Sequence, residues 1–221
     1  MFKSRARAII IPQAEHARFA GVLAHLWGNE FFDSPHIPHA SFVTGVTFHD
    51  RGYEMLDNAS IKEIDKDTWL EFQKRGALPQ FTDIHADLVV RFHVRRLLLT
   101  HATPDREALA GEIGKQIDSS LATHRLTAAA FAWTDHITHL CDALSFDFCF
   151  EERKKNLLAV HLKWGSDELV DVQYEICDSG EIIISPWPLC VEKYQGFLIG
   201  YELEGYPTRQ EPVHVPFLLH P

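Results

Sequence analysis

Paired cysteines, long apolar runs and clustered positive charge are all scarce in this 221-residue sequence. The four cysteines, at positions 141, 149, 177 and 190, include no CxxC pair, so a structural zinc site of the usual spacing is not expected. No apolar run approaches the roughly 20 residues that span a bilayer, and the start, MFKSRARAIIIPQAEH, lacks the apolar stretch of a signal peptide. These absences favour a cytoplasmic protein in a reducing environment, with no membrane partner.

Positive charge is outweighed by negative charge: 21 Lys and Arg stand against 31 Asp and Glu, which gives a formal net charge of -10. Proteins that bind phosphate backbones carry clustered Lys and Arg. The one short basic cluster here, ERKK at 152–155, is flanked by acidic residues. A nucleic acid duplex is therefore not expected as the main partner.

Apolar residues and histidine are abundant. Hydrophobic residues make up 46% of the chain, with 15 Phe and 5 Trp, which is ample for a packed core. The length predicts one domain, or one domain with a small appendage. Of the 14 histidines, 11 lie in the first 150 residues, so any imidazole chemistry is expected there.

Helical patterns dominate the sequence up to residue 150. Residues 5–12 look like a short strand or extended lead-in, and residues 51–80 look polar and irregular. For residues 40–50 a buried helix is favoured, although the β-branched residues leave a strand open. Thr103 followed by Pro104 marks a helix start. The remaining predicted helices cover 12–29, 82–103, 103–124 and 125–150.

Beyond residue 152 the pattern changes to short alternating segments separated by turn signals such as WGSD and DSGE. We expect a mainly α protein, with a helical body at 1–152 and a strand-rich extension at 153–221. The extension would form a small antiparallel sheet packed on the body. Its aromatic strands leave pairing with a second copy, as a homodimer, open.

His49 and Asp50 are two adjacent metal-capable residues at the end of the apolar segment 40–50. Neighbouring residues on a helix point about 100° apart, so both reach one ion only at a helix end, and Gly52 makes such an end plausible. A helix cap with a hydrogen-bonded histidine is the plainer alternative. A catalytic metal needs about three or more protein ligands, so the dipeptide requires partners from other helices.

Two partners stand out on physical grounds. His16 shares one helical face with Ala20, Leu23 and Trp27, so it is predicted to point inward, whereas His25 is predicted to point outward. Asp142 lies on the apolar face of the last helix, in CDALSF, where a lone carboxylate is costly unless it is paired or bound to a metal.

Three stretches together, IIPQAEHARFAGVLAHLWG, TFHDRGYEMLD and HLCDALSFDFC, resemble a family of uncharacterised HD-like proteins, catalogued as a domain of unknown function. The resemblance covers most of the chain, including PWPL in the strand-rich part. In its order of His, His-Asp and Asp, this pattern is similar to that of the HD-type metal-dependent phosphohydrolases. The resemblance implies an HD-like helical bundle.

By the same resemblance, His16, His49, Asp50 and Asp142 match metal ligands. Some HD-type enzymes hold a second metal with further histidines, and His101 is the better candidate for that role, ahead of His93. Mixed His and carboxylate ligation suits Mn, Fe, Co, Ni or Zn. Asp135 and His139 share the face of Asp142, so they are candidates to line the same cavity, with a solvated helix end as the alternative.

The expected chemistry is hydrolysis of a small phosphate ester or nucleotide, in which a metal that Asp50 helps to hold activates water. Arg18 and Arg51 flank the ligands and are candidates to bind the phosphate, with a structural ion pair as the alternative for each. Two other functions stay open. One is a non-catalytic scaffold that binds a small molecule or a protein, and the other is an iron-dependent oxygenase.

Overall fold

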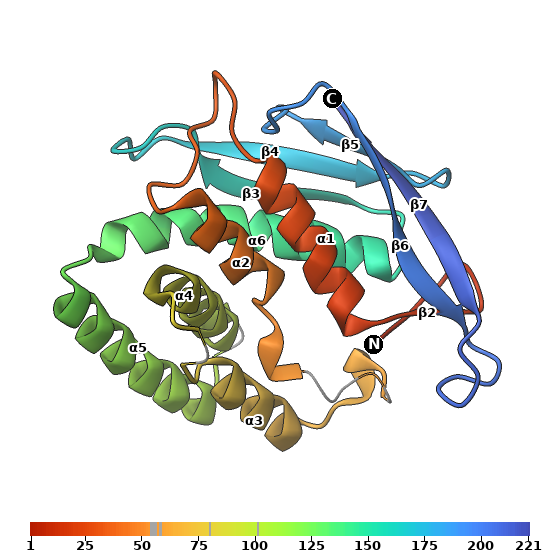
Figure 1. The fold of residues 1–221 in the computed structure, drawn as a ribbon, viewed down its shortest axis with the longest axis horizontal. Coiled ribbons are helices and arrows are strands. Elements are labelled where there is room, and N and C mark those ends of the chain that lie inside the picture. Colours follow the sequence, from red (N-terminus) through yellow and green to blue (C-terminus); the bar gives the residue numbers. More distant parts are fainter. Residues whose placement is uncertain (54–56, 58, 80, 101) are drawn as a thin grey trace.

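The computed structural model describes residues 1–53, 57, 59–79, 81–100 and 102–221 (Figure 1). Helices make up 47% of the chain and strands 21%. The helices are α1 (Gln13–Leu26), α2 (His39–Thr47), α3 (Lys66–Gly76), α4 (Ile84–Thr100), α5 (Pro104–His124) and α6 (Ala128–Cys149), with short 3-10 turns η1 (Arg51–Tyr53) and η3 (Ile61–Glu63). The strands are β1 (Phe2–Lys3), β2 (Ile9–Ile11), β3 (Lys155–His161), β4 (Leu169–Ile176), β5 (Glu181–Ser185), β6 (Tyr194–Glu202) and β7 (Pro212–His220).

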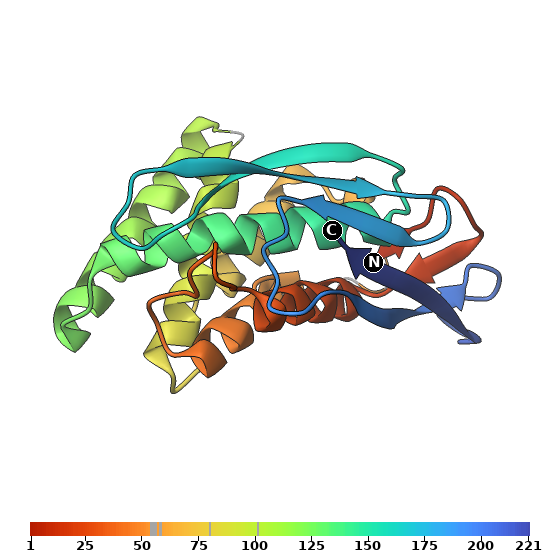
Figure 2. The ribbon, with the colours of Figure 1, turned by 90° about the horizontal axis from the view of Figure 1, so that it is seen from above.

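The strands form one mixed sheet of seven, in the order β1-β2-β6-β7-β5-β4-β3. Neighbouring strands are antiparallel, except that β5 and β7 run parallel. The sheet curls into a half-barrel, and Figure 2 shows α6 running lengthwise along it with α1 nearby.

Aromatic side chains join these two helices to the sheet. The rings of Phe19 on α1 and Phe148 on α6 lie 5.3 Å apart, and both contact Phe217 on β7. Val215, Phe217 and Leu219 are all buried, as expected for a strand that turns every second side chain toward the core. The main core therefore lies between the curled sheet and the pair α1 and α6.

The other helices pack on the far side of α1 and α6 (Figure 1). Helix α2 lies between α1 and α4, and α4 packs in turn against α5, α6 and α3. Helices α1, α2, α4 and α6 thus pack on one another around a common centre. That centre is where the inward-facing histidines lie.

The prediction of a mainly α, HD-like bundle with a small C-terminal antiparallel sheet is wrong. The sheet has seven strands, it includes a parallel pair, and it takes in β1 and β2 from the N-terminus. Ile9 pairs with Glu202, and Ile10 pairs with Tyr201. A local pattern gives no sign of a pairing between segments about 190 residues apart, so the size of the sheet was missed.

The predictions of individual helices agree better with the structure. Four of them are confirmed as α1, α4, α5 and α6, and residues 39–47 are helical rather than extended. Thr103 caps α5 as predicted, because its hydroxyl accepts a hydrogen bond from the backbone N–H of Arg106. The prediction that residues 51–80 are irregular is wrong, because they contain α3. The Asp65 carboxylate caps the N-terminus of this helix.

None of the helices in the described part of the chain combines the length and the apolar character that crossing a bilayer requires. Even α6, with 22 residues, carries three aspartates, at positions 135, 142 and 147. The expectation that no helix spans a membrane is confirmed for these residues.

Gly45 allows α2 to approach α4 closely. A Cβ atom built on Gly45 would lie 2.6 Å from Cβ of Val89 and 3.0 Å from the carbonyl oxygen of Ala86. Real side chains do not tolerate such contacts without a shift of the helix. The position of α2 matters because the segment that follows it carries His49 and Asp50.

We expect Gly45→Ala to lower the free energy of unfolding by about 1–2 kcal/mol, because overpacking costs about 1–3 kcal/mol and outweighs the roughly 0.5–1 kcal/mol gained by removing a helical glycine. Gly111→Ala is the matched control, since Gly111 lies on the exposed side of α5 with nothing near its Cβ position. The control should stabilise the protein. Urea denaturation measures both, and equal stabilisation by the two variants would contradict the close approach.

Candidate functional site

Four side chains from three separate segments meet at the centre of the helices. His16 comes from α1, His49 and Asp50 follow α2, and Asp142 comes from α6. Both histidines are buried, whereas the carboxylates keep 9% and 14% of their side-chain surface exposed. The carboxylate side of the cluster is therefore the one that faces solvent.

The ring nitrogens and carboxylate oxygens of this cluster are nearly equidistant. Nε2 of His16 lies 3.1 Å from Nε2 of His49. The same atom of His16 lies 3.3 Å from Oδ2 of Asp50 and 3.4 Å from Oδ1 of Asp142. For Nε2 of His49 the corresponding distances are 3.6 Å and 3.3 Å.

Hydrogen bonds from outside the cluster fix the two imidazoles. Nδ1 of His49 lies 2.7 Å from the carbonyl oxygen of Val46, which only accepts, so this nitrogen carries the hydrogen. Nδ1 of His16 lies 2.8 Å from Oγ of Ser145, whose hydroxyl donates to the carbonyl of Asp142. Ser145 therefore accepts from His16. In the neutral rings both Nε2 lone pairs consequently face the centre.

Four acceptors facing one another require a positive charge between them. Burial opposes a charge on His16, but hydrogen bonding to Asp142 and Asp50 outweighs burial and holds the pKa of His16 well above its usual value. Burial also opposes ionisation of the two carboxyls, yet the neighbouring histidines prevail and lower the pKa of Asp50 and of Asp142. The positive charge is either a proton on His16 or a metal ion.

The donor set fits a divalent transition metal. Ligand atoms at about 2.0–2.1 Å from one ion lie about 2.9–3.4 Å from each other in octahedral or tetrahedral arrangements, close to the 3.1–3.6 Å found here. His16, His49 and Asp142 alone already form a group of the kind that holds a metal. Gln13 on α1 supports the set, because its side-chain amide donates to Oδ2 of Asp50.

His93 and Arg96, one helical turn apart on α4, border the cluster. Nε2 of His93 lies 3.5 Å from Oδ1 of Asp50. Arg96 donates from Nη2 to Nδ1 of His93 at 2.8 Å and from Nε to Asp135 at 3.0 Å. His49, Asp50 and His93 form a second group with metal-capable atoms near one another.

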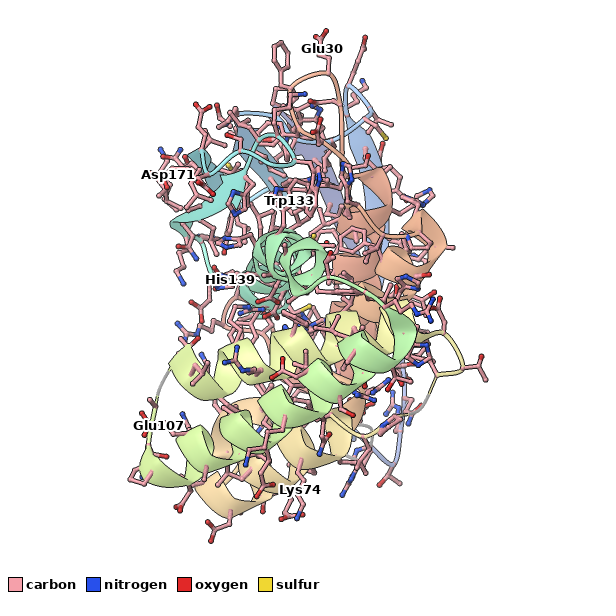
Figure 3. All side chains as sticks on the ribbon, turned by 90° about the vertical axis from the view of Figure 1, so that its left-hand side faces the viewer. Glu30, Lys74, Glu107, Trp133, His139 and Asp171 are labelled. Atoms are coloured by element: carbon pink, nitrogen blue, oxygen red, sulfur yellow. The ribbon has the colours of Figure 1, made fainter. Side chains whose placement is uncertain are left out.

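A cavity of about 320 Å³ adjoins the two carboxylates. Figure 3 shows His139 on the side of α6 away from the sheet and Trp133 on the side toward it. Burial, helped by Arg96, lowers the pKa of His139 to about 4, so this ring is neutral at neutral pH. The lining includes Asp50, Asp142, His139, two cationic side chains (Lys62 and Arg96) and three aromatic ones (Tyr53, Trp69 and Phe146).

The structure does not bring every predicted residue to the cluster. Arg18 is 43% exposed and binds Glu15 and the carbonyl of Phe197. Arg51 is buried but contacts Asp87 and the carbonyls of Gly76 and Leu78, which ties η1 to α3 and α4. Both arginines thus have the structural ion pairs that were the alternative to phosphate binding. His101, the expected extra ligand, lies outside the described residues.

Sequence reasoning missed Gln13, Ser145 and Arg96. Each lies three residues from a cluster residue on the same helix: Gln13 before His16, Ser145 after Asp142 and Arg96 after His93. Residues at that spacing share a helical face. A search for polar residues one turn from each candidate ligand would have found all three.

We expect Ser145→Ala to lower the free energy of unfolding by about 1–3 kcal/mol, because it leaves the buried Nδ1–H of His16 without its acceptor. Ser119→Ala, on the exposed side of α5, is the matched control and should change stability by less than about 0.5 kcal/mol. Urea denaturation compares the two variants. Equal stabilities would mean that Ser145 does not anchor His16.

We also expect Arg51→Ala to destabilise the protein by about 3–5 kcal/mol, because it breaks a buried ion pair. Arg18→Ala should cost less than about 1 kcal/mol, as exposed ion pairs do. Thermal or urea unfolding measures both. A stable Arg51→Ala protein would show that the contacts of Arg51 are not structural.

Comparison with known proteins supplies a family but no activity. No curated protein and no solved structure matches the chain, and nothing links it to the HD-type phosphohydrolases. A family model matches residues 2–198, which is most of the chain. This match confirms the expectation of a family of unknown function, but not the expectation that the family is HD-like. The chain belongs to the family described as "Protein of unknown function (DUF3891)".

Proposed function

We propose that the protein is a metal-dependent hydrolase of small phosphate esters, with one divalent transition metal held by His16, His49, Asp50 and Asp142. One observation carries the proposal: four acceptor atoms converge, with the histidine lone pairs directed inward, beside a cavity that adjoins the carboxylates. A mixed set of imidazole and carboxylate suits Mn, Fe, Co, Ni or Zn.

The cavity supports an anionic substrate. Lys62 and Arg96 both line it, and such side chains bind phosphate oxygens. Lys62 is 45% exposed, so its ammonium group can leave Glu152, which lies 3.2 Å away. A volume of about 320 Å³ suits a small ester, and the rings of Tyr53 and Trp69 offer an apolar surface to its organic part.

The chain's own residues would have distinct roles. Gln13 and Ser145 hold Asp50 and His16 in place, and Lys62 and Arg96 offset charge on the phosphoryl oxygens. His139 stays neutral and can accept a hydrogen bond from a substrate hydroxyl. The metal, when bound, supplies Lewis-acid chemistry and acidifies a water molecule.

The raised pKa of His16 favours a second candidate, a non-catalytic scaffold. In that case the proton on His16 satisfies the facing acceptors permanently, and the cluster is a structural part of the core. The cavity would then bind a small molecule without turning it over. The two candidates differ in one property, which is whether the cluster binds a metal.

His16→Ala and His25→Ala form a matched pair for the test, because both residues lie on α1 and only His16 faces the cluster. We expect about one equivalent of transition metal in protein purified without chelator or nickel resin. His16→Ala should lose it and His25→Ala should keep it, since a missing ligand weakens the whole set. Elemental analysis measures the content.

Turnover of chromogenic phosphate esters with added Mn is measured on the same three proteins. Activity in the wild type and His25→Ala, lost in His16→Ala, supports the hydrolase. A protein that takes up no Mn, Fe or Zn contradicts the hydrolase and supports the scaffold. Metal content without turnover, in a coloured and air-sensitive protein, would point to an oxygenase instead.

For the location we propose a reducing compartment such as the cytoplasm. All four cysteines carry free thiols, and Cys141 and Cys149 are buried in the core. Disulfides persist mainly in oxidising compartments.

A further inference from the structure

We propose that the metal centre is mononuclear and that Arg96 keeps it so, by fixing His93 in the tautomer whose Nε2–H faces Asp50, so that His93 is not a metal ligand. The statement about the metal rests on the proposed function, whereas the statement about His93 holds with or without an ion. Toward the metal, Arg96 and His93 are positioning residues; Arg96 also lines the cavity, where the proposed function places its positive charge near the substrate.

Among the described residues, the second group of metal-capable atoms is the one formed by His49, Asp50 and His93. His49 cannot serve two ions there, because its Nδ1–H is bound to the carbonyl of Val46 and only Nε2 has a lone pair. Within the described part of the chain, a second ion at this group would therefore depend on Asp50 and on Nε2 of His93.

Arg96 removes His93 from that role. A guanidinium group only donates hydrogen bonds, and Nη2 of Arg96 lies 2.8 Å from Nδ1 of His93. Nδ1 must therefore accept, and the single hydrogen of the neutral ring lies on Nε2. A nitrogen that carries a hydrogen cannot bind a metal.

The hydrogen on Nε2 has one acceptor near it. Nε2 of His93 lies 3.5 Å from Oδ1 of Asp50 and makes no hydrogen bond among the described residues, so its hydrogen faces this carboxylate without a close contact. The other oxygen of Asp50, Oδ2, faces His16 and His49. The same oxygen accepts a hydrogen bond from the side-chain amide of Gln13, and carboxylates that ligate a metal are usually hydrogen-bonded in turn.

The charges around Arg96 agree with a single ion. The two carboxylates in the ligand set balance one divalent cation. The guanidinium lies 3.0 Å from Asp135 and 3.8 Å from Asp142, so it balances Asp135 and adds positive charge beside Asp142. Arg96 thus serves as a fixed positive charge beside the metal.

Long-range ¹H–¹⁵N NMR, which distinguishes the two histidine tautomers, tests the proposal on the full chain, without metal and with Zn added. We expect the Nε2–H tautomer for His93 in both samples and uptake of one equivalent of Zn. Arg96→Met should lose that tautomer preference, which frees Nε2 of His93 to bind a metal, and should take up more than one equivalent of Zn. Arg95→Met, at the exposed neighbouring position on α4, should change neither.

The outcomes are separable. In the wild type, an Nδ1–H tautomer of His93, a Zn-bound His93 or two equivalents of Zn would overturn the proposal, and none of these readings depends on Arg96→Met folding. If the protein binds no Zn but His93 shows the Nε2–H tautomer, the metal-dependent function fails while the role of Arg96 in fixing the ring stands.

Discussion

The convergence of His16, His49, Asp50 and Asp142 on one point is the constraint on which the rest of the structure depends. Two imidazole nitrogens 3.1 Å apart, with two carboxylates beside them, repel one another unless a positive charge lies between them. The packing of α1, α2 and α6, with Gly45 allowing α2 to lie close against α4, holds these groups together. The helix packing itself therefore forms a cluster that requires either a proton or a metal ion at its centre.

The surroundings determine what this site can do. Val46 and Ser145 orient the rings of His49 and His16 through hydrogen bonds to Nδ1, on the side away from the centre of the cluster. Gln13 holds Asp50, and Arg96 sets the tautomer of His93. These bonds leave the carboxylate side facing a cavity with cationic and aromatic walls. The curled sheet touches the cluster through Phe2 on β1, whose ring centroid lies 5.0 Å from that of His16, and it also holds α1 and α6 in place.

Much of the site could be predicted from local pattern, because helical periodicity determines which residues share a face. This periodicity predicted that His16 points inward and His25 outward, as observed. It also predicted that Asp142 is a carboxylate on an apolar face. The pairing of β2 with β6 could not be predicted from local pattern, since it joins segments that are far apart in the sequence. The partners of Arg51 could not be predicted for a related reason: they lie on α3 and α4 and come near Arg51 only in the folded chain.

The most direct test of the account is crystallography of the wild-type protein soaked with Mn or Zn, with data collected at the absorption edge of the metal. The account predicts one anomalous peak within about 2.0–2.3 Å of Nε2 of His16, Nε2 of His49 and the facing oxygens of Asp50 and Asp142. Absence of a peak at this point, with the four side chains unmoved, would contradict it and would make the cluster a proton-bearing part of the core.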